Sequence, residues 1–175
     1  MNASHSNPLP HQSRLNVIYP PDELQRQNWL QIARVYWRMA RMMSIALRPQ
    51  NITVAQFEIL AILDAQQGIS QQELAEHLLV TKGNVCTVIG RMEEAGYIKR
   101  VADPSDGRAK QLFLTSAGQS LFAAIAPLIH GSIQDVFGGL SIRQQQDLQQ
   151  LLDQLERSLM EKGLSASNVN ADSES

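Results

Sequence analysis

A single cysteine, Cys86, is present in the 175 residues, so no disulfide can form within the chain. One cysteine suits a reducing compartment, and the first residues lack the apolar core of a signal peptide, so we expect a cytoplasmic protein. No apolar run approaches the roughly 18 to 20 residues of a membrane span, and no membrane contact is expected. The four histidines and the cysteine show no metal-ligand spacing. We therefore expect no metal and no cofactor.

Motifs of catalysis are also missing from the sequence. It has no glycine-rich phosphate loop and no nucleophile elbow, and its carboxylates do not pair, so an enzyme is the class that it favours least. The net charge of −2 alone does not indicate nucleic acid. Its distribution does: residues 81–114 hold six Lys and Arg against four acids, whereas residues 54–80 hold four acids and neither Lys nor Arg. Such a basic centre can present a local positive face.

The composition divides the chain into three parts. Residues 1–21 are polar and contain prolines, which predicts a disordered or extended arm, and residues 163–175 predict a disordered tail. Between them, residues 22–162 predict one mainly helical domain. Its long end helices, within 22–48 and 116–162, carry apolar stripes that predict packing on the domain and on a partner subunit.

The centre of the chain, residues 54–114, predicts a winged helix-turn-helix. A capping box, Ser70 to Glu73, begins a short helix, and Thr81 is a good cap for the next one. The expected elements are helices at about 54–66, 71–78 and 81–95, and strands at 97–101 and 110–114. The fold class is therefore mainly α with a small β-hairpin wing, flanked by dimerisation helices.

The second helix of this unit is the predicted recognition helix. Val85, Val88, Ile89 and Met92 share one face at helical spacing and predict its buried side. Small and polar residues on the other sides would allow close approach to the major groove of DNA. An ordinary surface helix is the alternative interpretation. The predicted DNA contacts of this helix are Thr81, Lys82, Gly83, Asn84, Thr87 and Arg91.

The hairpin supplies the second predicted set of DNA contacts. Arg108 has a planar fork suited to a narrow, electronegative minor groove, and Asp106 is placed to hold that fork in position. Arg100 and Lys110 add positive charge along the strands. If these side chains are only solvated, the charges contribute little.

The segment "RMEEAGYIKRVADPSDGRAKQLFLTSAG" (91–118) closely resembles the MarR family of bacterial transcription regulators. "SQQELAEHLLVTKGNV" and "GLSIRQQQDLQQLLDQL" extend the resemblance to about residues 25–160. It implies a homodimer that binds double-stranded DNA at a pseudo-palindromic operator, with recognition helices in successive major grooves roughly 34 Å apart. By analogy with the family, we expect a repressor.

The same resemblance implies that a small aromatic or anionic effector modulates DNA binding. A solvated arginine face beside the dimer core is the interpretation of the first helix that we favour. The residues of this helix that could instead bind an effector are Trp29, Arg34, Tyr36, Arg38 and Arg41. Two alternative functions stay open. One is a redox-responsive regulator acting through Cys86 on the recognition helix. The other is a winged-helix protein-interaction module that does not bind DNA.

Overall fold

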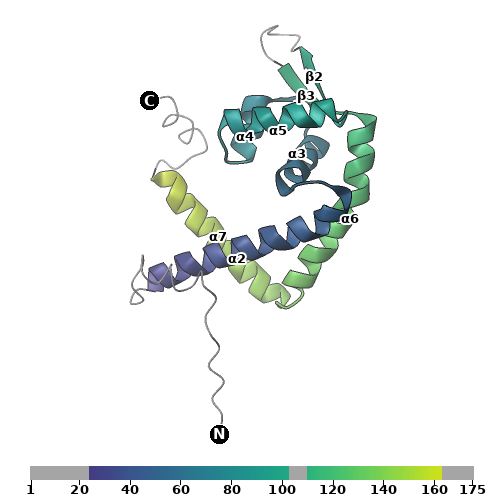
Figure 1. Ribbon diagram of the computed structural model, residues 1–175. Helices are drawn as coiled ribbons and strands as arrows, with labels where there is room; N and C mark the ends of the chain where they lie inside the picture. The colour runs from purple at the N-terminus through teal and green to yellow at the C-terminus, as the bar shows by residue number, and fades with distance from the viewer. Residues whose placement is uncertain (1–23, 103–109, 163–175) are drawn as a thin grey trace, which may run out of the picture. The chain divides into compact units, whose positions relative to one another are not determined.

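The structure is a computed structural model that describes residues 24–102 and 110–162, shown in Figure 1. The chain forms two compact units, residues 1–42 and 43–175. Helix α2 (Leu24–Leu47) begins in the first unit and ends in the second. This helix confirms the one predicted within residues 22–48.

In the first unit, α2 leaves all three of its aromatic side chains in solvent. Trp29, Tyr36 and Trp37 are 62%, 63% and 70% exposed, whereas Leu30 is buried. The rings of Tyr36 and Trp37 meet edge to face with centroids 5.5 Å apart. Such exposed aromatic area is unusual for a helix with no partner.

The second unit contains the predicted winged helix-turn-helix. Its elements after α2 are the 3-10 helix η1 (Arg48–Gln50), α3 (Val54–Ala65), β1 (Ile69–Ser70), α4 (Gln71–His77), α5 (Lys82–Glu94), β2 (Ile98–Ala102), β3 (Lys110–Leu114), α6 (Ser116–Phe137) and α7 (Ile142–Glu161). The sheet is antiparallel with the order β1-β3-β2. Arg100 of β2 lies opposite Leu112 of β3, and Ile69 of β1 lies opposite Leu112 on its other side. The sequence pattern predicts both strands of the wing but not β1.

One hydrophobic core joins these elements. Leu60 of α3, Leu74 of α4, Ile89 of α5 and Leu112 of β3 are completely buried. The core extends beyond the predicted winged segment, because Leu47 of α2 and Ile125 and Ile129 of α6 belong to it. The boundaries predicted at residues 54 and 114 therefore mark changes of element within one core.

Helix α6 corrects one expectation. By length and composition, Ser116–Phe137 is apolar enough to cross a membrane, so it was wrong that no apolar run approaches that length. In the fold, however, Phe122 packs against Phe57 of α3 with ring centroids 5.9 Å apart, and Ile129 is buried. A core helix of a folded domain meets the same criterion, and we assign α6 to that class.

Helix α7 begins at a capping box in which Ser141 and Gln144 bond each other's backbone N–H. None of its residues is buried. The predicted leucine stripe is present but lies in solvent; Leu151 is 65% exposed and Leu155 is 44% exposed. A shallow hollow of about 400 Å³ lies between this stripe and Phe137 of α6. Helix α7 thus has an apolar face that the single chain leaves uncovered.

Candidate nucleic-acid interface

Helix α4 and the turn after it position α5, the predicted recognition helix. The predicted capping box is confirmed: Ser70 Oγ accepts from Glu73 N at 3.1 Å, and Glu73 Oε2 accepts from Ser70 N at 2.7 Å. At its other end, Val80 N donates to Ala75 O at 3.1 Å and Leu79 N donates to Glu76 O at 3.2 Å. This is a Schellman motif, with Leu79 at the left-handed position that glycine usually occupies.

Leu79 is therefore an unusual residue at this turn. Its φ is 54° and its side chain is 66% exposed. A left-handed conformation costs a residue with a Cβ about 1 kcal/mol or more. The sequence pattern predicts a turn here but not the left-handed conformation of Leu79.

Helix α5 buries the predicted face. Val85, Ile89 and Met92 are at most 2% exposed, and Val88 is half-buried against the same core. The predicted contact residues Gly83, Asn84, Thr87 and Arg91 lie in solvent. An added Cβ at Gly83 or Gly90 would meet no atom of the described chain within 4 Å. The outer face of α5 thus has no side chains at its glycines and is not covered at these positions by other described residues. Close approach to a groove requires such a surface.

The N-terminus of α5 differs from those of its neighbours. Thr81 is the N-cap residue, as predicted, but its side chain makes no capping hydrogen bond, whereas Thr53, Ser70 and Thr115 each cap their own helix. The Thr81 hydroxyl and the first N–H groups of α5 are therefore available to an acceptor such as a phosphate. The side chain of Lys82 lies outside the described part of the structure.

A second Schellman motif connects α5 to the wing. Tyr97 N donates to Met92 O and Gly96 N donates to Glu93 O, both at 2.9 Å, with Gly96 at a φ of 77°. The chain then turns directly into β2, so that the hairpin extends from the end of α5 (Figure 1). Lys110 is exposed at the start of β3, opposite Ala102. The predicted contacts Asp106 and Arg108 lie outside the described residues.

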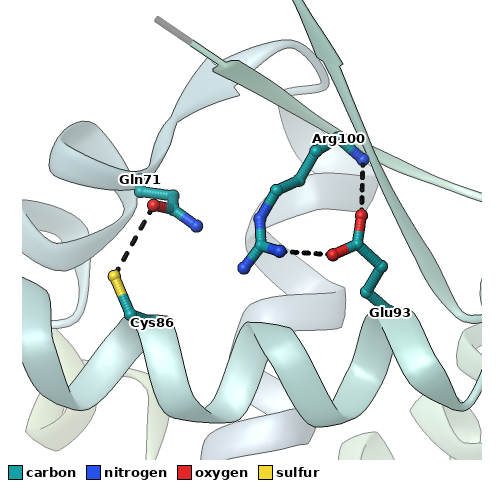
Figure 2. A network of polar contacts seen from close by, with 4 residues as sticks. All are labelled: Gln71, Cys86, Glu93 and Arg100. Carbon is teal, nitrogen blue, oxygen red and sulfur yellow. Dashed lines mark hydrogen bonds and ion pairs between the residues drawn. The ribbon is translucent and has the colours of Figure 1, made fainter.

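Arg100 does not lie free along the wing. Its Nη1 forms an ion pair with Glu93 Oε2 of α5, and its backbone N donates to Glu93 Oε1 at 3.3 Å (Figure 2). The Arg100 side chain is only 23% exposed. Figure 2 also shows Gln71 of α4 beside the guanidinium and Cys86 of α5 beyond it. Nothing in the sequence identifies Gln71 or Glu93 as partners of Arg100, and a DNA contact by Arg100 stays a prediction.

The candidate effector residues lie outside the winged helix-turn-helix, and the sequence predicts no metal site. The candidate effector residues all lie on α2 in the first unit, where Trp29, Tyr36, Arg38 and Arg41 are exposed. Arg34 is half-buried, and its Nε has no hydrogen-bond partner in the structure as described. In residues 24–102 and 110–162, no three His, Cys, Asp or Glu side chains gather into a group that would hold a metal ion.

Comparison with known proteins identifies the family. A model of the MarR family matches residues 52–110. An HTH-type transcriptional repressor of Mycobacterium tuberculosis is 32% identical over 112 residues, which cover 64% of this chain and 81% of the relative. The transcriptional regulator HosA of Escherichia coli O111:H- is 29% identical over 102 residues, covering 58% of this chain and 76% of HosA.

Solved structures agree in fold. A mutant of Escherichia coli MarR complexed with operator DNA matches with a TM-score of 0.69 and 26% identity, over 81% of this chain and 96% of that one. The transcriptional regulator SlyA matches with a TM-score of 0.70 and 24% identity, over 77% and 94% of the two chains. The chain belongs to the MarR family of winged helix-turn-helix transcriptional regulators, which are not enzymes.

Proposed function

We propose that this regulator is a homodimeric repressor that binds a pseudo-palindromic operator in double-stranded DNA. The observation that carries the proposal is the outer face of α5, where Gly83 and Gly90 leave open space and Asn84 and Thr87 lie in solvent. Side chains of this kind can bond base edges and phosphates once the helix is in the major groove. The related Escherichia coli MarR, solved in complex with operator DNA, supports DNA binding by this chain.

The basic residues around this face would position the protein on the duplex. Arg91 is exposed in the last turn of α5, and Lys110 is exposed on β3. We assign these two and Lys82 to phosphate contacts, which supply affinity without reading sequence. On the strength of the sequence alone, we assign Arg108 to the flanking minor groove and give Asp106 the role of orienting it.

The dimer is proposed from apolar surface that a single chain leaves in solvent. On α7, Leu151, Leu152 and Leu155 are each at least 44% exposed, and on α6 Leu128 and Val136 are 48% and 45% exposed. Contiguous apolar area of this kind typically marks an interface. A two-fold dimer would present two copies of α5 to successive major grooves.

We further propose that a small aromatic anion modulates DNA binding from α2. The supporting observation is that Trp29 and Tyr36 share this helix with four arginines, one of which, Arg34, has an unpartnered Nε among the described atoms. Control through Cys86 has weaker support: its thiol is half-buried and faces Gln71 of α4. The alternative function is a protein-interaction module that does not bind DNA. Selection of bound duplexes from a random DNA pool distinguishes the two functions.

The proposal is tested by selecting bound duplexes from a random DNA pool at about 150 mM salt, since affinity depends steeply on salt. Wild type and Arg108→Ala are compared. We expect an enriched inverted repeat that the variant binds about tenfold more weakly, because a well-placed arginine in a groove contributes about 1 to 3 kcal/mol. Failure to enrich any sequence would favour the interaction module, and enrichment of a single half-site would contradict the dimer.

A second prediction concerns Thr81. Thr81→Ala should weaken operator binding about threefold to tenfold and leave the melting temperature unchanged, because its hydroxyl makes no capping bond in the free protein. Ser70→Ala is the matched control: it breaks a formed capping box and should cost about 1 kcal/mol of stability. Thermal denaturation and DNA titration measure both effects. Equal losses of stability in the two variants would mean that Thr81 caps α5 in solution.

A further inference from the structure

Arg100 connects three elements of the DNA-binding lobe. It lies on β2, its ion-pair partner Glu93 lies on α5, and Gln71 lies at the first position of α4 (Figure 2). Glu93 bonds residue 100 twice, once at the guanidinium and once at the backbone N–H. The end of the recognition helix is thus fastened to the middle of the first wing strand.

The orientation of the Gln71 amide decides what Gln71 contributes. With its oxygen toward Cys86, as drawn in Figure 2, Oε1 accepts from Sγ at 3.6 Å and the amide N–H groups face the N–H groups of Arg100. With the amide reversed, Oε1 accepts from Arg100 Nε at 3.0 Å and from Nη2 at 3.1 Å. The second orientation is the one that gives Arg100 Nε and Nη2 an acceptor. We assign it on that ground, because a guanidinium has donors only and a thiol is a weak partner.

In this orientation the Arg100 fork is occupied on two sides. Glu93 Oε2 accepts from Arg100 Nη1, and Gln71 Oε1 accepts from Arg100 Nε and Nη2. The N–H groups of this guanidinium therefore already bond acceptors of the protein. Its planar shape fixes β2 with respect to both α4 and α5. Partly exposed pairs add little to stability, but a held geometry lowers the cost of ordering an interface when DNA binds.

We propose that Gln71 is a positioning residue for DNA binding, which acts through Arg100 to fix the wing relative to the recognition helix. The inference depends on the proposed function, since it assumes that α5 and the wing contact the operator together. It assigns Arg100 a role inside the protein rather than on a phosphate. A lysine at position 100 would keep the charge but could not bridge Gln71 and Glu93 in the same plane.

The test uses the full-length protein and its selected operator. Operator affinity is titrated over a series of salt concentrations for wild type, Gln71→Met, Arg100→Lys and the double variant. Methionine keeps the length and packing of glutamine without its amide. Gln72→Met is the matched control, because Gln72 is also half-buried on α4 but bonds Glu76 at 3.0 Å instead of Arg100. Melting temperatures show that each variant is folded.

We expect Gln71→Met and Arg100→Lys each to weaken operator binding about fivefold, with the salt dependence unchanged. The double variant should bind like Arg100→Lys alone, because the two residues act through one contact. Gln72→Met should bind like wild type. Wild-type affinity in either single variant, or full addition of the two effects in the double variant, would overturn the proposal. A wild-type protein that selects no operator would instead refute the proposed function.

Discussion

Gly90→Ala is expected to stabilise the free protein while weakening its binding to operator DNA. Gly90 lies inside α5, where an added Cβ would meet no atom of the described residues within 4 Å. Alanine in a helix interior is favoured over glycine by about 0.5 to 1 kcal/mol, so the melting temperature should rise by a few degrees. The same methyl group would occupy space that the groove surface fills in the complex. We expect operator affinity to fall about tenfold, since overpacking a close contact costs about 1 to 3 kcal/mol.

Gly131→Ala separates these two effects. Gly131 is in the interior of α6, and an added Cβ there also meets nothing within 4 Å in the described structure. It should therefore give a similar gain in stability with unchanged affinity for DNA. Because Gly90→Ala changes no charge, its loss of affinity should also be the same at every salt concentration. If Gly90→Ala binds the operator as tightly as wild type, the outer face of α5 does not enter the groove.

Local signals were enough to predict much of this fold from the sequence. Ser70 and Glu73 stand at capping-box spacing, and the box forms. Val85, Ile89 and Met92 stand at helical spacing, and all three are buried. Gly96 directly follows Ala95, the C-cap of α5, and takes the left-handed position that ends the helix. Each of these features depends on residues close together in the chain, which is why periodicity and capping rules identify them.

Two kinds of feature were not predictable from the sequence. One depends on contacts between residues far apart in the chain, and the other on a residue in a conformation that its side chain disfavours. Strand β1 has two residues, and it is a strand only because Ile69 and Ser70 pair with β3, more than forty positions away. Leu79 adopts a conformation that its side chain disfavours, so its identity gives no indication of the turn. For the same reason the sequence does not predict the partners of Arg100, because nothing local indicates that Glu93 and Gln71 lie beside its guanidinium. Side-chain networks between elements require the tertiary structure.

Gly118→Ala should strongly destabilise the protein, although alanine is the better helix former. Gly118 lies in the first turn of α6, and an added Cβ would stand 2.2 Å from Tyr97 O, a backbone atom. That carbonyl is fixed in place, because it accepts from Thr115 N at 3.0 Å while Thr115 Oγ1 donates to Gly96 O. A clash with constrained backbone costs about 1 to 3 kcal/mol or more, which exceeds the helix-propensity gain of about 1 kcal/mol.

The position of this clash also predicts an effect on DNA binding. Tyr97 and Thr115 lie at the base of the wing, directly before β2 and directly after β3, so relief of the clash must move α6 away from the hairpin or move the hairpin itself. Thermal denaturation of Gly118→Ala should therefore show a lower melting temperature, and operator titration should show weaker binding in the fraction that remains folded. Gly131→Ala, the same change further along α6, should raise the melting temperature instead. Equal stability of the two alanine variants would mean that α6 does not approach Tyr97 this closely in solution.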